Sequence, residues 1–185
     1  MSDFKRMLLA HQEVMQSLEP LLPQFEAAAA TVVDCLKSGS KIMLCGNGGS
    51  AADAQHIAAE IMGRFETERA ALPAIALTTD TSILTAVGND YGYESIFSRQ
   101  IQGLARPGDL LIGYSTSGNS ANVIKAVEQA KVFGCKVITL TGRDGGALSK
   151  MADVDLCVAS NSTARIQEAH AFLGHALCAV VDKAN

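Results

Sequence analysis

Short apolar runs alternate with segments of helical periodicity along most of this chain. The apolar runs occupy residues 41–45, 74–77, 109–114, 136–140 and 154–158. Strands covered on both faces show such runs, because neither face meets water. Helical spacing of apolar residues covers residues 50–65, 81–87, 93–104, 119–133, 147–151 and 163–183. The alternation predicts an α/β fold with a doubly wound parallel sheet.

Two more helical segments precede the first apolar run, at residues 4–18 and 22–36, and the second ends at Gly39. There is no internal repeat and no low-complexity linker, so we expect one domain over residues 1–185. The N-terminal segment is amphipathic and lacks a continuous apolar core, which argues against a signal peptide. No apolar run approaches the ~18 residues of a membrane span.

Composition adds three expectations. Apolar residues make up 48% of the chain and charged residues only 18%, below the usual quarter, so we expect surface buried against copies of the same chain. The net charge of −4 argues against a nucleic-acid binder, which needs a basic field. The five cysteines form no CxxC pair and favour small buried side chains in a reducing, cytoplasmic setting.

A glycine-rich turn follows the first apolar run. Residues 46–50 read Gly-Asn-Gly-Gly-Ser, and a helical pattern leaves them. A strand, a glycine turn and a helix N-terminus present backbone N–H groups to an anion. His56 and Glu60, four residues apart, share a helix face beyond this turn. The glycine spacing does not match the dinucleotide fingerprint, so the segment predicts chemistry on a small anionic molecule instead.

A hydroxyl-rich loop follows the apolar run at residues 109–114. It contains Ser115, Thr116, Ser117 and Ser120. A helix cap needs one such hydroxyl, so four of them favour a phosphate site at the carboxyl end of the strand. The P-loop pattern GxxxxGK[ST] is missing, which argues against a nucleotide.

The C-terminal helical segment carries Gln167 and His175. They are eight residues apart, ~12 Å along a helix. Both can bind one central ion only if their side chains extend toward each other. With His56 and Glu60 they compose a nitrogen and oxygen ligand set that suits zinc. A hydrogen-bonded core role for a histidine on this apolar helix stays open.

These motifs stand in order within longer blocks, at residues 45–60, 72–80, 88–100, 115–126, 137–146 and 164–175. Over nearly its whole length the chain resembles the bacterial phosphoheptose isomerases, single-domain members of the sugar-isomerase (SIS) family. The resemblance implies a five-stranded parallel sheet and a homotetramer with active sites at subunit junctions. It also implies isomerisation of sedoheptulose 7-phosphate to D-glycero-D-manno-heptose 7-phosphate, for the heptose of lipopolysaccharide.

By position in these blocks, the resemblance assigns roles to individual residues. Glu60 and His175 correspond to the catalytic residues, which fits a base and an acid for aldose–ketose isomerisation. One zinc ion per subunit is implied at His56, Glu60, Gln167 and His175. The implied substrate contacts are Asn47, Gly48, Gly49, Asn89, Asp90, Ser115, Thr116, Ser117, Ser120 and Gln167. Residues 89–92, the most polar segment in the middle of the chain, are expected to form a loop.

Two alternatives within the same family stay open. One is a DiaA-like protein that binds a replication initiator, which residues 64–69 resemble. The other is a sugar-phosphate-binding domain without turnover. Glu60 and His175, together with both complete loops, favour the enzyme over an adaptor protein that binds a replication initiator. The lack of an attached DNA-binding domain argues against a sensor domain that binds sugar phosphate without turnover.

Overall fold

The computed structural model describes residues 2–184, and over these residues it contains one five-stranded sheet. All strand pairs are parallel, in the order β2-β1-β3-β4-β5. The strands are β1 (Ile42–Cys45), β2 (Ala74–Ala76), β3 (Leu110–Ser115), β4 (Lys136–Gly142) and β5 (Val154–Val158). The predicted doubly wound parallel sheet is confirmed.

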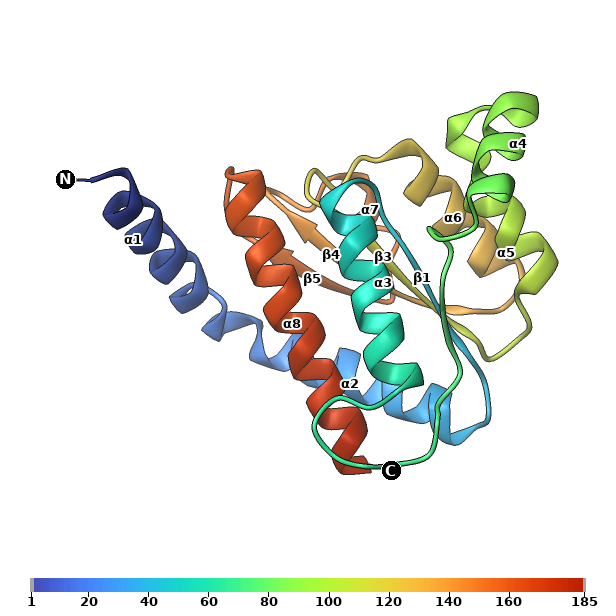
Figure 1. The fold of residues 1–185 in the computed structure, drawn as a ribbon, viewed down its shortest axis with the longest axis horizontal. Helices are drawn as coiled ribbons and strands as arrows, with labels where there is room; N and C mark the ends of the chain where they lie inside the picture. The colour runs from blue at the N-terminus through green and yellow to red at the C-terminus, as the bar shows by residue number, and fades with distance from the viewer. Residues whose placement is uncertain (1, 185) are drawn as a thin grey trace.

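Helices cover both faces of this sheet (Figure 1). The first layer contains α2 (Leu22–Lys37), α3 (Gly49–Met62) and α8 (Thr163–Ala184). The second contains α5 (Ser98–Leu104), α6 (Ala121–Val132) and the short α7 (Gly146–Ser149). Successive strand residues point to opposite faces of the sheet. Leu44 therefore packs in the core under the first helix layer and Met43 in the core under the second. Four of the five cysteines are buried and all five are free, as expected.

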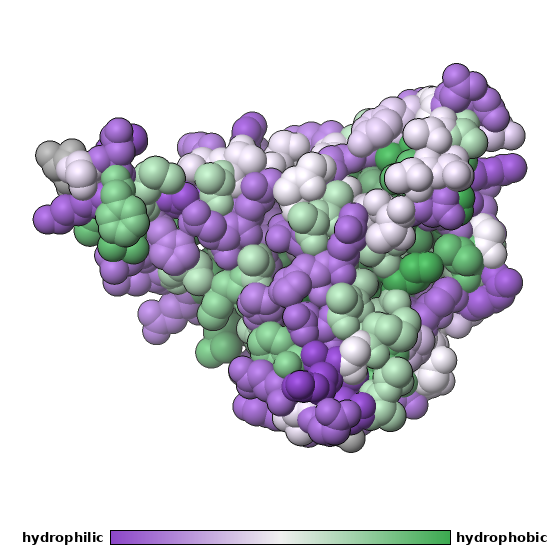
Figure 2. Space-filling model, in the orientation of Figure 1, coloured by the Kyte–Doolittle hydropathy of each residue, from purple (hydrophilic) through white to green (hydrophobic). Residues whose placement is uncertain are grey.

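The N-terminal helix α1 (Asp3–Gln16) projects from the body of the molecule and leads through a 3₁₀ turn (Glu19–Leu21) into α2 (Figure 1). The Ser2 hydroxyl caps it by accepting a hydrogen bond from the Lys5 backbone N–H, at 3.3 Å. Figure 2 shows apolar side chains on the surface of this helix. Phe4 keeps 77% of its surface exposed. Within residues 2–184, no helix is both long and apolar enough to cross a membrane.

Three predicted helices have wrong bounds. The helix expected over residues 50–65 is α3, which ends at Met62, so Phe65 lies beyond it. The helix expected to end at residue 87 is α4 (Thr81–Tyr91), so Asn89 and Asp90 lie in its last turn and not in a loop. The helix continues through Gly88 and ends at Gly92, whose φ of 87° favours glycine. The helix expected over residues 93–104 is divided into a 3₁₀ turn (Tyr93–Ser95) and α5.

The interruption before α5 lets two large side chains enter the core. Ile96 and Phe97, at the junction, are only 2% and 1% exposed and belong to the second core layer. Burial of two such side chains stabilises the fold by about 3–6 kcal/mol. That gain outweighs the cost of breaking the helix, which explains why helical periodicity alone misplaced the element.

Candidate functional site

The two polar loops singled out in the sequence leave adjacent strands of the sheet. Strand β1 pairs with β2 on one side and with β3 on the other. Where strand order reverses in this way, a crevice opens at the carboxyl ends of the two central strands. The glycine turn after β1 and the hydroxyl loop after β3 both lie at this edge. The fold therefore brings together two segments that are about 70 residues apart.

An amide pair joins the two segments directly. Asn47 Nδ2 donates to Asn122 Oδ1 at 2.8 Å, and Asn122 Nδ2 donates to Asn47 Oδ1 at 2.8 Å. Tyr93 Oη donates to the same Asn47 oxygen at 3.1 Å. Our sequence interpretation missed Asn122 and Tyr93. A polar Asn122 near the start of the apolar helix α6 was the available signal, since buried amides need partners.

The hydroxyl loop gathers its serine side chains instead of using them as caps. Ser115 Oγ lies 2.8 Å from Ser120 Oγ and 3.5 Å from Ser117 Oγ. Ser120 is the N-cap residue of α6, yet within the described structure its side chain makes no capping hydrogen bond. The three hydroxyls at a strand end and helix N-terminus form a cluster of donors suited to an anion. Helix capping alone does not account for this arrangement.

Gly118 allows this loop to fold against its neighbour. Its φ is 66°, and a Cβ there would lie 2.0 Å from the Gly145 carbonyl oxygen. Asn119 continues the contact, since its Oδ1 accepts from the Ala147 backbone N–H at 3.0 Å. The loop is therefore held in place by the turn after β4, and no larger residue fits at position 118.

Helices α3 and α8 lie side by side and place three of the predicted residues together (Figure 1). His56 Nε2 is 2.7 Å from His175 Nε2, and the rings meet edge to face with centroids 4.9 Å apart. Glu60 Oε1 lies 3.7 Å from His56 Nε2. The Glu60 side chain is 24% exposed, so its carboxylate is reachable from solvent but not freely solvated.

Gln167 meets the start of α3, two turns before this group. A Cβ on Gly49 would lie 2.5 Å from Gln167 Nε2, so the Gln167 amide packs directly on this glycine and would have to move for any larger residue. The seven residues between Gly49 and His56 span about 10 Å of helix. Gln167 therefore lies beside the glycine turn, and His175 lies beside His56. Within the described residues, no three His, Cys, Asp or Glu side chains lie close enough together to hold a metal ion.

Asp53 is a further carboxylate near the histidine pair that the sequence interpretation missed. Burial raises its pKa, and the nearby His56 and His175 rings partly offset that rise. Its Oδ2 is buried without a hydrogen-bond partner among the residues described. The spacing of three residues from Asp53 to His56, which puts both on one helix face, was the signal.

Asn89 and Asp90 lie apart from these hydrogen bonds. Both are exposed, and Asn89 Nδ2 donates to Asp90 Oδ1 at 2.8 Å at the end of α4. Thr116, between the serines of the hydroxyl loop, is half-buried. Gly48 makes the turn before α3 with a φ of 56°, and a Cβ there would meet open space. The assignment of these residues to substrate stays a prediction.

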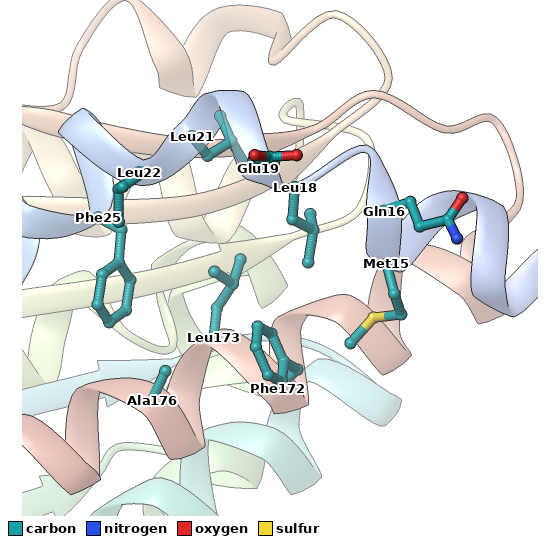
Figure 3. Close-up of a pocket in the computed structure, with 10 residues that line it drawn as sticks. All are labelled: Met15, Gln16, Leu18, Glu19, Leu21, Leu22, Phe25, Phe172, Leu173 and Ala176. Carbon is teal, nitrogen blue, oxygen red and sulfur yellow. The ribbon is translucent and has the colours of Figure 1, made fainter.

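A hollow away from these loops has an apolar lining. An apolar groove of about 450 Å³ lies between α8 and the segment that joins α1 to α2 (Figure 3). Phe25, Phe172 and Leu173 point into it. Almost every lining side chain is apolar, and no set of polar groups converges there, so the groove is unsuited to a sugar phosphate. By contrast, a hollow of about 590 Å³ is lined by Ser117, Asn119 and Arg143, with Asp144, Ala159, Ser160 and Asn161.

Known proteins match both the sequence and the fold. Residues 9–142 match the family model of the SIS domain. A phosphoheptose isomerase of Aliarcobacter butzleri (strain RM4018) is 58% identical over 175 residues, 94% of this chain and 93% of that protein. The structure of phosphoheptose isomerase GmhA from Neisseria gonorrhoeae superposes with a TM-score of 0.92 at 49% identity, covering 97% of both chains. A phosphoheptose isomerase from Francisella tularensis gives 0.91 at 40% identity, covering 99% of this chain and 100% of that one. The chain therefore belongs to the SIS domain family, within its phosphoheptose isomerases.

Proposed function

We propose that this protein is an aldose–ketose isomerase that converts sedoheptulose 7-phosphate to D-glycero-D-manno-heptose 7-phosphate. The convergence of His56, Glu60 and His175 along α3 and α8, about two to three turns from the glycine turn at the crevice, carries the proposal. The relatives named phosphoheptose isomerase support it, since several match over more than nine-tenths of both chains. An adaptor would have no use for a carboxylate and an imidazole held together in this way.

The chemistry requires one proton to move between neighbouring carbons. A base removes a proton from C1 of the ketose, and the electron pair forms an enediol with the C2 oxygen protonated. Proton return at C2, with loss of the O1 proton, gives the aldehyde at C1. We assign proton removal to Glu60 and protonation of oxygen to His175. Their side chains face the same imidazole, that of His56, so one bound substrate can contact both.

The hydroxyl cluster supplies the phosphate subsite in this proposal. The hydroxyl of Ser115 lies within 3.5 Å of those of Ser117 and Ser120, and each hydroxyl can turn to donate to a phosphate oxygen. Asn47, in the glycine turn before α3, is held by Asn122, two residues after the Ser120 N-cap of α6. We infer that it contacts the sugar hydroxyls between the phosphate and the reacting carbons.

We further propose that zinc binds at the histidine pair. The donor types suit zinc, because two imidazole nitrogens face each other and a carboxylate oxygen lies 3.7 Å from one of them. These three side chains do not form a three-ligand group as they stand in the described residues, so zinc binding would draw them closer together. His56, Glu60 and His175 would hold the ion. Gln167 lies beside Gly49, about two turns away along α3, and would join them only after a change of conformation. The chemistry supplied there is polarisation of the substrate carbonyl. Glu60 would then be one of the residues that hold the ion, in addition to its proposed role as the base.

Self-association as a homotetramer in the cytoplasm completes the proposal. The exposed apolar side chains of α1 support it, because monomers rarely leave such a face uncovered. Light scattering on a sizing column measures the assembly directly. A monomer at assay concentrations would contradict this part of the proposal.

The test of the activity is direct. Purified protein is incubated with sedoheptulose 7-phosphate, and the aldose is detected by NMR of its C1 proton, with fructose 6-phosphate as the control ketose. The proposal predicts aldose formation from the heptulose phosphate. No aldose from well-folded protein supplied with zinc would refute it.

A further inference from the structure

The segment between α3 and β2 is not used by the proposed chemistry, yet it is firmly held. Figure 1 shows it turning round the C-terminal end of α8 before it returns to the sheet. Asp182 Oδ2 accepts hydrogen bonds from the backbone N–H groups of Glu66 and Thr67, at 2.7 and 2.8 Å. Its Oδ1 accepts from Arg69 Nε at 2.8 Å. Both side chains of this ion pair are only 3% exposed.

Arg69 also holds the end of α3. Its Nη2 donates to the Glu60 carbonyl and its Nη1 to the Ile61 carbonyl, both at 2.9 Å. Carbonyls in the last turn of a helix lack partners within it, so the guanidinium satisfies them. Arg69 and Asp182 thus join the C-terminal ends of α3 and α8. These two helices carry Glu60 and His175.

Phe65 is the side chain of this segment that reaches the site. Its ring stacks on the imidazole of His175 with centroids 5.3 Å apart and planes inclined by 24°. The Nε2 atom of the same imidazole faces His56 at 2.7 Å. The His175 ring is therefore restrained on its face by Phe65 and at its edge by His56.

We propose that Phe65 is a positioning residue that fixes the orientation of the His175 ring for proton transfer, with Arg69 and Asp182 holding Phe65 in place. The inference rests on the role proposed above for His175. An acid works only within hydrogen-bond reach of the atom it protonates, and a displacement of about 1 Å can cost about a hundredfold in rate. The imidazole of a histidine rotates about two side-chain bonds. A stacked aromatic ring restricts rotation about the second of these bonds, which sets the direction of the ring nitrogens.

The test compares substitutions of Phe65 with the same substitution at a control phenylalanine, Phe172. Phe65→Leu keeps an apolar side chain but removes the flat face, and should lower kcat about tenfold with KM within about twofold. Phe65→Tyr keeps the face and should restore most of kcat. The control is Phe172→Leu, the same change on α8 three residues before His175. Phe172 is 49% exposed and lines the apolar groove of Figure 3, so its replacement should leave kcat unchanged.

A second readout reports the ring itself. The chain has four histidines, so ¹³C-labelled histidine gives a simple NMR spectrum. The His175 signal is assigned with His175→Gln. Removal of the stacked ring in Phe65→Leu should shift this signal, because the ring current of Phe65 acts on it. Phe172→Leu should not shift it.

Three results would overturn the inference: full kcat in Phe65→Leu, a His175 signal that does not move, or a Phe65→Tyr variant as slow as Phe65→Leu. The His175→Gln variant distinguishes failure of the acid role of His175 from failure of the positioning role of Phe65. If it retains the parent's kcat, the acid assignment fails and the positioning role fails with it. If it is inactive while Phe65→Leu is fully active, only the positioning role is lost.

Discussion

His170 should make this fold sensitive to mild acid. Its side chain is fully buried in α8, and its Nε2 donates to the Thr141 carbonyl at 2.9 Å. Its Nδ1 has no partner within residues 2–184, and the ring packs edge to face on Tyr114. Burial lowers the pKa of His170 to about 4, and the hydrogen bond to Thr141 offsets only part of that effect. The folded protein therefore holds the neutral ring over a range in which the unfolded chain takes up a proton.

The direction and the size of the pH effect on the free energy of unfolding follow from proton linkage. With a folded pKa of about 4 against 6.5 in the unfolded chain, the unfolded state binds more protons between these values. The stability is fully present above pH 6.5 and is lost as pH falls toward 4. From pH 7.5 to pH 5 the loss from this residue is about 2 kcal/mol, and the full shift corresponds to about 3 kcal/mol.

The assay is urea unfolding of the parent and of His170→Gln at pH 7.5, 6 and 5, at one chain concentration, since self-association changes apparent stability. Glutamine can donate to the Thr141 carbonyl but does not titrate. The variant should be less stable at pH 7.5, and the difference should shrink by about 2 kcal/mol at pH 5. An unchanged difference across this range would refute the reasoning.

Three further predictions concern the loop, the ion pair and the metal. The double variant with Ser117→Ala and Ser120→Ala should raise KM at least about tenfold, because charge-assisted hydrogen bonds are worth about 1.5–3 kcal/mol each. An unchanged KM in steady-state kinetics would refute the assignment of these serines to the phosphate. The melting temperature of the double variant should hardly change. Arg69→Ala should destabilise the fold by about 3–5 kcal/mol in urea unfolding, because Asp182 is left buried without its partner. The control Arg64→Ala, whose ion pair with Glu68 is exposed, should cost at most about 1 kcal/mol, and equal losses would contradict the account. Elemental analysis of protein purified without chelator should find about one zinc per chain; activity that survives complete zinc removal would leave His56, Glu60 and His175 as proton-transfer and hydrogen-bonding groups alone.

Much of the fold could be predicted because its strands are apolar at nearly every position. The run at residues 154–158 matches β5 residue for residue, and the two polar loops emerge where the strand pattern stops. Helix ends were harder. The polar residues 89–92 predicted a loop, yet α4 continues through Gly88 and ends at Tyr91. At Ile96 and Phe97 tertiary burial broke a helix that local periodicity favoured.

The site was predictable as residue types but not as contacts. His56 and Glu60 share a helix face by spacing alone, whereas the approach of His175 to His56 depends on how α3 packs against α8. The same packing places Gln167 at Gly49, two turns away. Phe65 was missed because its residue type does not signal chemistry, and Asn122 was missed although a polar side chain near the start of an apolar helix offered a signal. Their roles arise from partners more than 70 residues away in the sequence.

The central claim is that Glu60 moves the substrate proton in a phosphoheptose isomerase. It is tested most directly by the exchange of solvent deuterium into C1 of sedoheptulose 7-phosphate, followed by NMR for the parent and for Glu60→Gln. Glutamine keeps the size and one oxygen of the side chain but cannot accept a proton at neutral pH. Loss of a general base costs about 10²–10⁴ in rate. The account predicts exchange and aldose formation in the parent, and a collapse of both in Glu60→Gln with substrate binding and assembly retained. A Glu60→Gln variant that exchanges within about threefold of the parent rate would contradict it.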